Sequence, residues 1–243
     1  TAATAAAPLD EQFTGVKNIE TVAFDPVSGN AGAIAEMDVS KLSAGVTSVE
    51  LDMRDAQDAG LGVTTATITN LGSQTVVLKH TVADATDTND SDGPKVTITG
   101  ATDTASDSIN ITLDAAGRSS GGATKGYNAV DVANFETVNI ETGKSTDGTV
   151  TTGEIQTLTA TSATSVVLTG AADVFIGSVT GGAMTSFDAS AATGKVHIEN
   201  VRVQTNYIGS TDSTLHLDPG DDRAITGLVR VHGDFQVDGT TTT

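Results

Sequence analysis

The feature that most constrains the fold of this 243-residue chain is a series of short apolar, β-branched runs. Each run is followed within a few residues by Gly, Asp, Asn or Ser. This combination indicates β-strands joined by tight turns. Helical spacing is almost missing, and only 31–42 is expected to hold one or two helical turns. Strands are expected at 19–24, 46–53, 63–68, 75–78, 96–98, 109–113, 135–140, 155–158, 166–168, 174–176, 196–198, 215–217 and 228–231.

The composition narrows the kind of all-β fold. The chain has 41 Thr, 18 Ser and 26 Gly, and its 31 acidic residues are 23 Asp and only 8 Glu. Asp, Gly, Ser and Thr favour turns, caps and strands, whereas Glu favours helix interiors. Aromatic residues make up 3% of the chain and Trp is absent, so small branched side chains have to fill the core. Such side chains suit a narrow stack in which they form ladders.

The predicted fold is therefore an elongated, β-solenoid-like stack of short strands. The alternative is an immunoglobulin-like β-sandwich, which has strands at similar spacing but would more usually carry a core Trp. Disorder is the competing interpretation of a highly charged chain with few aromatic residues. The apolar residues, 37% of the chain, occur here in regular runs, which favours a folded array.

The sequence also repeats itself. Segments 18–24 and 134–140 share the pattern Asn, apolar, Glu-Thr-Val, any residue, apolar. After each comes a turn-rich stretch and then a strand with a Ser-Val pair, at 48–49 and 165–166. Such self-similarity indicates a stacked array in which each unit needs its neighbours to bury its apolar residues.

A boundary between two units is expected in the Gly-rich stretch 115–125, which has no apolar residue larger than Ala. The prediction is a first β-repeat unit at 1–118 and a second at 119–243. The Thr-rich and Ala-rich ends suggest that the sequence is a fragment of a longer chain.

Charge excludes several classes of function. The chain has 12 Lys and Arg against 31 Asp and Glu, a formal net charge of −19, and a sequence pI near 4.2. Such a surface repels nucleic acid and anionic membranes. No apolar run approaches the roughly 20 residues that span a bilayer. No cysteine is present, and neither a zinc-protease motif, a nucleophile elbow nor a phosphate loop is found, so no enzyme is expected.

The densest acidic stretch, 84–93, is a candidate calcium site. It contains Asp87, Asp90 and Asp92, whose mutual repulsion a hard divalent cation would relieve. The stretch is not an EF-hand, because Thr88 and Thr99 stand where that loop needs its first and last acidic ligands. A solvated acidic loop without a specific ion is the alternative.

A second acidic group surrounds the Pro-Gly pair at 219–220. Its candidate ligands are Asp218, Asp221 and Asp222, and Asp188 lies in a smaller turn. Each of these side chains can instead accept hydrogen bonds as an Asx-turn residue without any metal. Crowding so many Asp residues into turns leaves an uncompensated negative field, which favours at least one bound cation.

Three segments resemble a known family: 134–140, 158–170 and 185–191. Together they resemble the β-strand repeat region of calcium-dependent bacterial surface-layer (S-layer) proteins of the RTX type, as in Caulobacter and its relatives. The resemblance is good from about 129 to 194 and weaker at 15–60.

The resemblance implies an exported protein on the bacterial cell surface, where it forms a two-dimensional lattice. It implies calcium between strands and at subunit contacts, with copies of the same chain and cell-surface polysaccharide as partners. The family's Gly-Gly-x-Gly-x-Asp nonapeptide is not intact here, and 220–222 is the nearest approach, so its calcium ligands are not transferred. Asp188 matches best and is interpreted as a structural turn or ion site. A secreted RTX-type adhesin or biofilm-matrix module that binds glycans or neighbouring cells is the alternative.

Overall fold

The computed structural model describes most of the central part of the chain. The described residues are 19–24, 34–53, 65–79, 94–114, 117–119, 126–143, 150–181, 183–201, 206–210, 213–217, 229–230 and 235–237. All structural statements below refer to these residues.

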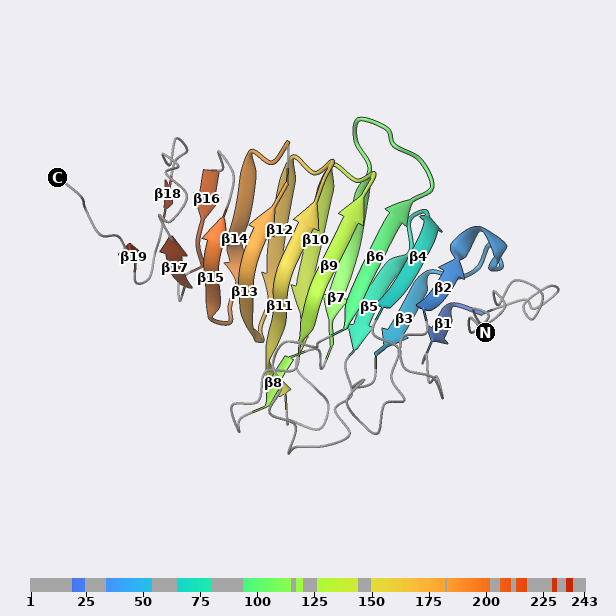
Figure 1. Cartoon of the computed structure of the whole chain (residues 1–243), viewed down its shortest axis with the longest axis horizontal. Helices are drawn as coiled ribbons and strands as arrows, with labels where there is room; N and C mark the ends of the chain where they lie inside the picture. Colours follow the sequence, from blue (N-terminus) through green and yellow to red (C-terminus); the bar gives the residue numbers. More distant parts are fainter. Residues whose placement is uncertain are drawn as a thin grey trace, which may run out of the picture.

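The strands form two long sheets that face each other and run the length of the molecule (Figure 1). The first sheet has the order β1 (Thr21–Phe24), β3 (Ser48–Asp52), β5 (Thr75–Lys79), β7 (Ser108–Leu113), β10 (Thr137–Thr142), β12 (Ser165–Gly170), β14 (Ser186–Ala192), β16 (Asn206–Ile208), β18 (Val229–Arg230). The second has the order β2 (Ile34–Asp38), β4 (Thr65–Leu71), β6 (Lys95–Gly100), β9 (Tyr127–Ala133), β11 (Val150–Ala160), β13 (Asp173–Thr180), β15 (Val196–Val201), β17 (Ser213–Leu217), β19 (Phe235–Val237).

Successive strands alternate between the sheets, and each strand pairs in parallel with the next strand of its own sheet. Thr21 pairs with Ser48, and Ser48 pairs with Thr75. One strand from each sheet therefore makes one rung, and rungs stack on one another. The exception is β8 (Gly117–Ser119), which pairs antiparallel with β11. The predicted all-β, solenoid-like stack is confirmed. An immunoglobulin-like sandwich, whose sheets are antiparallel, does not describe this topology.

The core lies between the two sheets and consists of ladders of equivalent side chains. In the first sheet, Val49 pairs in register with Val76, and Val76 with Ile111, and all three are buried. A parallel ladder of Leu51, Leu78 and Leu113 runs beside it. Every second residue points inward, as the alternating burial of β3 and β5 shows. The two stacked aromatic rings of Phe187 and Tyr207, 5.7 Å apart, continue the core in later rungs.

The internal repeat of the sequence corresponds to a repeated backbone corner. The carbonyl oxygen of Glu20 accepts hydrogen bonds from the backbone of Thr47 (2.8 Å) and Ser48 (3.0 Å). The carbonyl oxygen of Glu136 accepts the same pair from Thr164 (2.9 Å) and Ser165 (3.1 Å). In both corners the Thr hydroxyl donates to the same carbonyl at 3.2 Å. The Glu-Thr-Val and Thr-Ser-Val segments are thus corresponding positions of neighbouring rungs.

The described part of 31–42 holds one short helical turn and one strand that was not expected: Val39–Lys41 forms a 3-10 turn, and β2 covers Ile34–Asp38 before it. β2 pairs in parallel with β4, with Ile34 opposite Thr65, and this pairing supplies backbone hydrogen bonds. The local spacing of apolar residues does not show which segment will be the neighbour. No described residue belongs to a helix long and apolar enough to cross a membrane.

Six strands were not predicted from the sequence: β2, β8, β9, β14, β16 and β19. Across the proposed 118/119 boundary, β6 pairs with β9 and β7 with β10, so both sheets run through it. The division into units 1–118 and 119–243 stays a prediction.

Candidate functional site

Six of the seven predicted calcium ligands lie outside the described residues. These are Asp87, Asp90, Asp92, Asp218, Asp221 and Asp222. Asp188 is described, and within the described ranges no group of three or more His, Asp or Glu side chains has an arrangement that could hold a metal ion. The calcium sites therefore stay a prediction.

Asp188 lies within β14, and its carboxylate accepts a hydrogen bond from the backbone of the same strand. Its Oδ1 accepts a hydrogen bond of 2.9 Å from the backbone N–H of Ser190. Here the pairing shifts: Val167 pairs with Asp188, but Thr169 pairs with Ala191, so β14 has one extra residue. The carboxylate thus satisfies an N–H that the irregular ladder leaves without a strand partner. Asp188 therefore lies at a strand irregularity and not in the expected turn, and its role as an ion ligand stays a prediction.

Other described Asp side chains act as local hydrogen-bond acceptors too. Oδ1 of Asp38 accepts from Ser40 N (3.0 Å), Ser40 Oγ (2.6 Å) and Asn70 Nδ2 (2.9 Å). The bond from the Ser40 side chain, and then that from Asn70, lower the pKa of Asp38 below its ordinary value. Asp173 similarly accepts a 2.8 Å hydrogen bond from the backbone of Lys195 in the next rung.

Asp107 shows the same use of a carboxylate at the loop between β6 and β7. It accepts hydrogen bonds from Thr104 N (2.7 Å) and Thr104 Oγ1 (2.8 Å). These bonds, the backbone one first, lower the pKa of Asp107. Its own N–H donates to Glu136 Oε2 at 2.8 Å, which links the loop to β10's corner. In this part of the chain, Asp-rich turns are stabilised by hydrogen bonds to their own backbone and hydroxyl groups.

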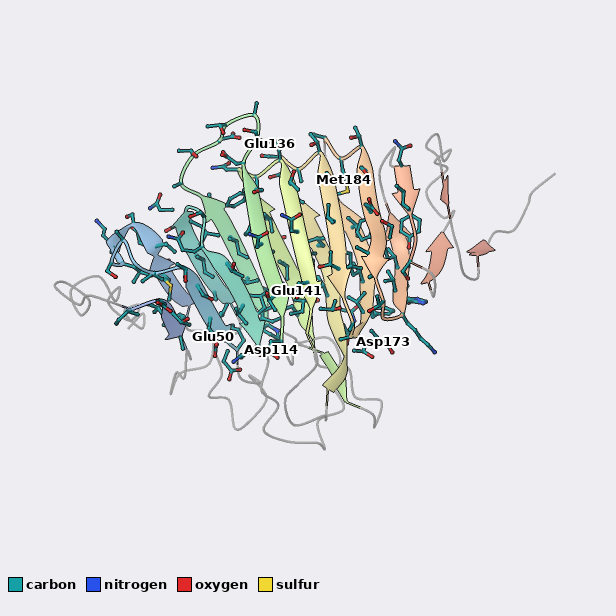
Figure 2. The ribbon with its side chains drawn as sticks, turned by 180° about the vertical axis from the view of Figure 1, so that it is seen from behind. Glu50, Asp114, Glu136, Glu141, Asp173 and Met184 are labelled. Carbon is teal, nitrogen blue, oxygen red and sulfur yellow. The ribbon has the colours of Figure 1, made fainter. Side chains whose placement is uncertain are left out.

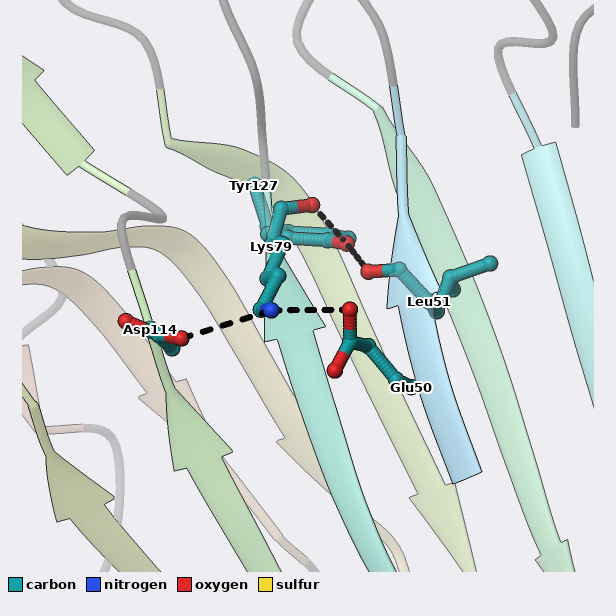
Figure 3. A network of polar contacts seen from close by, with 5 residues as sticks. All are labelled: Glu50, Leu51, Lys79, Asp114 and Tyr127. Atoms are coloured by element: carbon teal, nitrogen blue, oxygen red, sulfur yellow. Dashed lines mark hydrogen bonds and ion pairs between the residues drawn. The ribbon is translucent and has the colours of Figure 1, made fainter. Parts of the chain in front are cut away.

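One charged cluster crosses three rungs at the ends of β3, β5 and β7 (Figure 3). Nζ of Lys79 lies 2.7 Å from Glu50 Oε1 and 3.6 Å from Asp114 Oδ2. The hydrogen bond to Glu50 raises the pKa of Lys79 above its ordinary value. A single ammonium group thus offsets carboxylates on both neighbouring strands, which a parallel ladder would otherwise bring close together.

Tyr127 ties this cluster to the opposite sheet. It begins β9, its side chain is fully buried, and its hydroxyl donates to the carbonyl oxygen of Lys79 at 2.9 Å, with that of Leu51 3.4 Å away. Burial, and secondarily the charge of Asp52, raise the pKa of Tyr127 well above 10.0. The side chain therefore joins the two sheets as a neutral donor (Figure 3).

Sequence reasoning missed the Lys79 cluster, although the sequence contains its signal. The segments ending at Asp52, Lys79 and Asp114 share the pattern apolar, any residue, Leu, charged residue. Aligning these segments as successive rungs places Asp52, Lys79 and Asp114 side by side, with Glu50 two residues before Asp52 on the same strand. The chain length between rungs varies, so no fixed period in the sequence brings these segments into register.

His197, on β15, has a structural setting. Its ring stacks on Phe175 with centroids 5.1 Å apart, and its Nε2 lies 3.8 Å from Glu199 Oε1. Neither residue belongs to a group of metal-ligating side chains within the described ranges.

Comparison with protein-family models, curated proteins and solved structures finds no match for this chain. The functional argument therefore rests on the sequence and the geometry above.

Proposed function

We propose that this chain is a structural segment of a calcium-stabilised, self-assembling bacterial cell-surface protein of the S-layer type. The observation that carries the proposal is a pair of sheets, each with nine described strands paired in parallel and stacked rung on rung. Such a stack is extended and presents regular outer faces, which suits a building element of a lattice. Its proposed location is the outside of the cell, and its proposed partners are other copies of the chain and cell-surface polysaccharide.

The electrostatics support a role for calcium. With a net charge of −19, folding crowds carboxylates that the unfolded chain can keep apart. The first sheet illustrates this, because Glu50, Asp114 and Glu141 all lie along it (Figure 2). A cation that binds only the folded form adds about 2.7 kcal/mol per site at one hundred times its dissociation constant.

Electron microscopy of the purified protein with and without calcium tests the assembly. Ordered two-dimensional sheets that form only with calcium are expected. Soluble monomers that bind a glycan array would instead favour the adhesin or biofilm-matrix alternative.

Thermal melting separates specific calcium binding from screening. Calcium in the millimolar range, where extracellular sites commonly bind at about 0.1–1 mM, should raise the melting temperature more than sodium chloride of matched ionic strength. Equal melting temperatures in the two salts would contradict specific calcium binding.

Paired substitutions locate the sites. Asp90→Asn with Asp92→Asn, or Asp221→Asn with Asp222→Asn, should reduce the calcium-dependent rise. The matched control is Asp38→Asn with Asp107→Asn, which removes two charges from groups whose oxygens already accept hydrogen bonds. The control variant should show the same calcium-dependent rise in melting temperature as the wild type. This holds even if the melting temperature without calcium changes.

A further inference from the structure

Strand pairing brings two histidines and a glutamate together on the outer face of the second sheet. His197 and Glu199 are two residues apart on β15, so both lie on the same side of the strand. Ile198 between them is buried in the core, which places them on the outer side. The side chain of His197 is 40% exposed and that of Glu199 is 50% exposed, so a dissolved ion can reach both.

The register of β17 adds His216 to this pair. β15 and β17 pair in parallel with Ile198 opposite Leu215, and the same register places Glu199 beside His216. Because Ile198 is buried in the core, the next position of each strand lies on the outer face. The ladder is still regular at this point, since His216 pairs with Gln236 of β19.

His197, Glu199 and His216 are here called the His-Glu-His group. Neighbouring strands lie about 4.8 Å apart, and residues two apart on one strand are about 6.6 Å apart. The three Cα atoms therefore form a triangle whose longest side is about 8 Å, which one metal ion can span. The described side chains supply two members of the group, and the backbone register supplies the third.

The two described side chains are already close to the geometry of metal ligands. Nε2 of His197 lies 3.8 Å from Oε1 of Glu199. Two ligand atoms on a tetrahedral Zn²⁺, with bonds of about 2.0–2.1 Å, are about 3.4 Å apart. A small movement of either side chain therefore lets both atoms bind one ion.

Phe175 on β13 holds the ring of His197 in place. The two rings are stacked, with centroids 5.1 Å apart and an angle of 10° between their planes. A ring that is fixed by packing loses less conformational freedom when it binds a metal than a mobile ring does. The stacking therefore favours metal binding at His197.

The chemistry of the group selects zinc over calcium. Imidazole nitrogens are common ligands of Zn²⁺, whereas Ca²⁺ takes oxygen ligands. Two imidazoles and one carboxylate supply three of the four ligands of a tetrahedral zinc site, and water can take the fourth position at this exposed face. The net charge of −19 also attracts cations to the molecule.

We infer that the His-Glu-His group is a zinc site that joins β15 to β17. The strands at this end of the stack are short: β17 has five residues, β16 and β19 have three and β18 has two, against six in β10 and β12. Short strands form few ladder hydrogen bonds. A metal ion that binds two neighbouring strands of the folded chain therefore stabilises the stack where each rung has the fewest of them.

Isothermal titration of the untagged chain with Zn²⁺ in millimolar calcium tests the site. Calcium fills sites that consist of oxygen ligands, so zinc binding in its presence reports the imidazole ligands. One Zn²⁺ per chain with micromolar or tighter affinity is the expected result.

Substitutions assign the ligands. His197→Gln, Glu199→Gln and His216→Gln should each weaken zinc binding at least about tenfold, because even outer-shell partners of a metal site are worth about 10–100-fold in affinity. His80→Gln is the matched control, since it removes a histidine that follows β5 of the first sheet and should leave the affinity unchanged. Circular dichroism verifies that each variant is folded. Glu199→Gln keeps the size and shape of the side chain, so it tests the site even where a histidine variant does not fold.

Two further measurements distinguish a built site from adventitious binding. Co²⁺ in place of Zn²⁺ should give the intense visible absorption of a tetrahedral ion, and the three ligand variants should lose it. On adding Zn²⁺, hydrogen exchange should become slower in β15 and β17 and stay the same in β3 and β5.

Three results would overturn the zinc site. They are a wild type that does not bind Zn²⁺, equal zinc binding in the wild type and all three ligand variants, and hydrogen exchange in β15 and β17 that Zn²⁺ leaves unchanged. None of them bears on the proposed surface protein, which calcium-dependent assembly tests. A chain that does not respond to calcium would likewise leave the zinc site standing, because the predicted calcium ligands are all Asp residues elsewhere in the sequence.

Discussion

At the scale of single residues, Tyr127 tests how the two sheets are held together. Its hydroxyl donates to the carbonyl oxygen of Lys79, which also accepts the N–H of Met53, so Tyr127→Phe removes one hydrogen bond across the sheets and should lower the free energy of unfolding by about 1 kcal/mol at neutral pH. The pKa of Tyr127 is raised in the folded state, so its contribution is complete below the ordinary value of 10.0 and is lost as the pH rises further. Urea denaturation between pH 7 and 11 should therefore show a steeper alkaline loss of stability in the wild type than in Tyr127→Phe. Parallel pH profiles would contradict the neutral-donor role.

At the scale of elements, the turns that follow β10 and β12 depend on close backbone approach. Thr142 occupies the position of the leucine ladder, pairs with Leu113 and Gly170, and donates from Oγ1 to the carbonyl oxygen of Ala172 at 2.9 Å. Gly170 has φ +108, and a Cβ there would lie 2.3 Å from the carbonyl oxygen of Thr142. Gly170→Ala should therefore cost at least about 2 kcal/mol of stability through backbone strain and overpacking. Gly45→Ala is the matched control, because its Cβ would meet only Ile19 O at 3.5 Å, and its effect should stay within about 1 kcal/mol. Equal melting temperatures for the two variants would refute this account of the turn.

At the scale of the whole molecule, stability should depend on position along the stack, because each rung contacts only its neighbours. Val22 and Val138 follow the same Glu-Thr pair, but β1 is a terminal strand of the first sheet whereas β10 lies between β7 and β12. Val138→Ala removes buried methyl groups between two rungs and should cost about 2 kcal/mol. Val22→Ala should cost less, because a terminal rung can open without unfolding the rest. Hydrogen exchange measured by mass spectrometry should show slow amides in β7, β10 and β12 and faster ones in β1. Uniform protection along the stack would argue against rung-by-rung stability.

The sequence by itself determined the all-β class, most strand positions and the corner repeat. Alternating apolar residues and turn residues act locally, and the Thr-Ser-apolar corner recurs at 47–49, 164–166 and 185–187, so these features can be detected without knowing which strands are neighbours. The prediction failed for β9 and β14, whose Ala, Asp, Asn and Ser residues have low strand propensity. Both strands form because a parallel neighbour on each side supplies their backbone hydrogen bonds, which overrides local preference.

The register between neighbouring strands decides which side chains meet at the candidate sites. Only the tertiary structure determines this register. The sequence singled out Asp188 as an Asp in a turn, but pairing with β12 places it beside a strand irregularity where it accepts the N–H of Ser190. The spacing between rungs changes from 27 residues at Thr47 to 21 at Thr185, so no fixed period aligns the charges. Whether Lys79 meets two carboxylates depends on which strands lie about 4.8 Å apart, and that is set by packing across the whole stack.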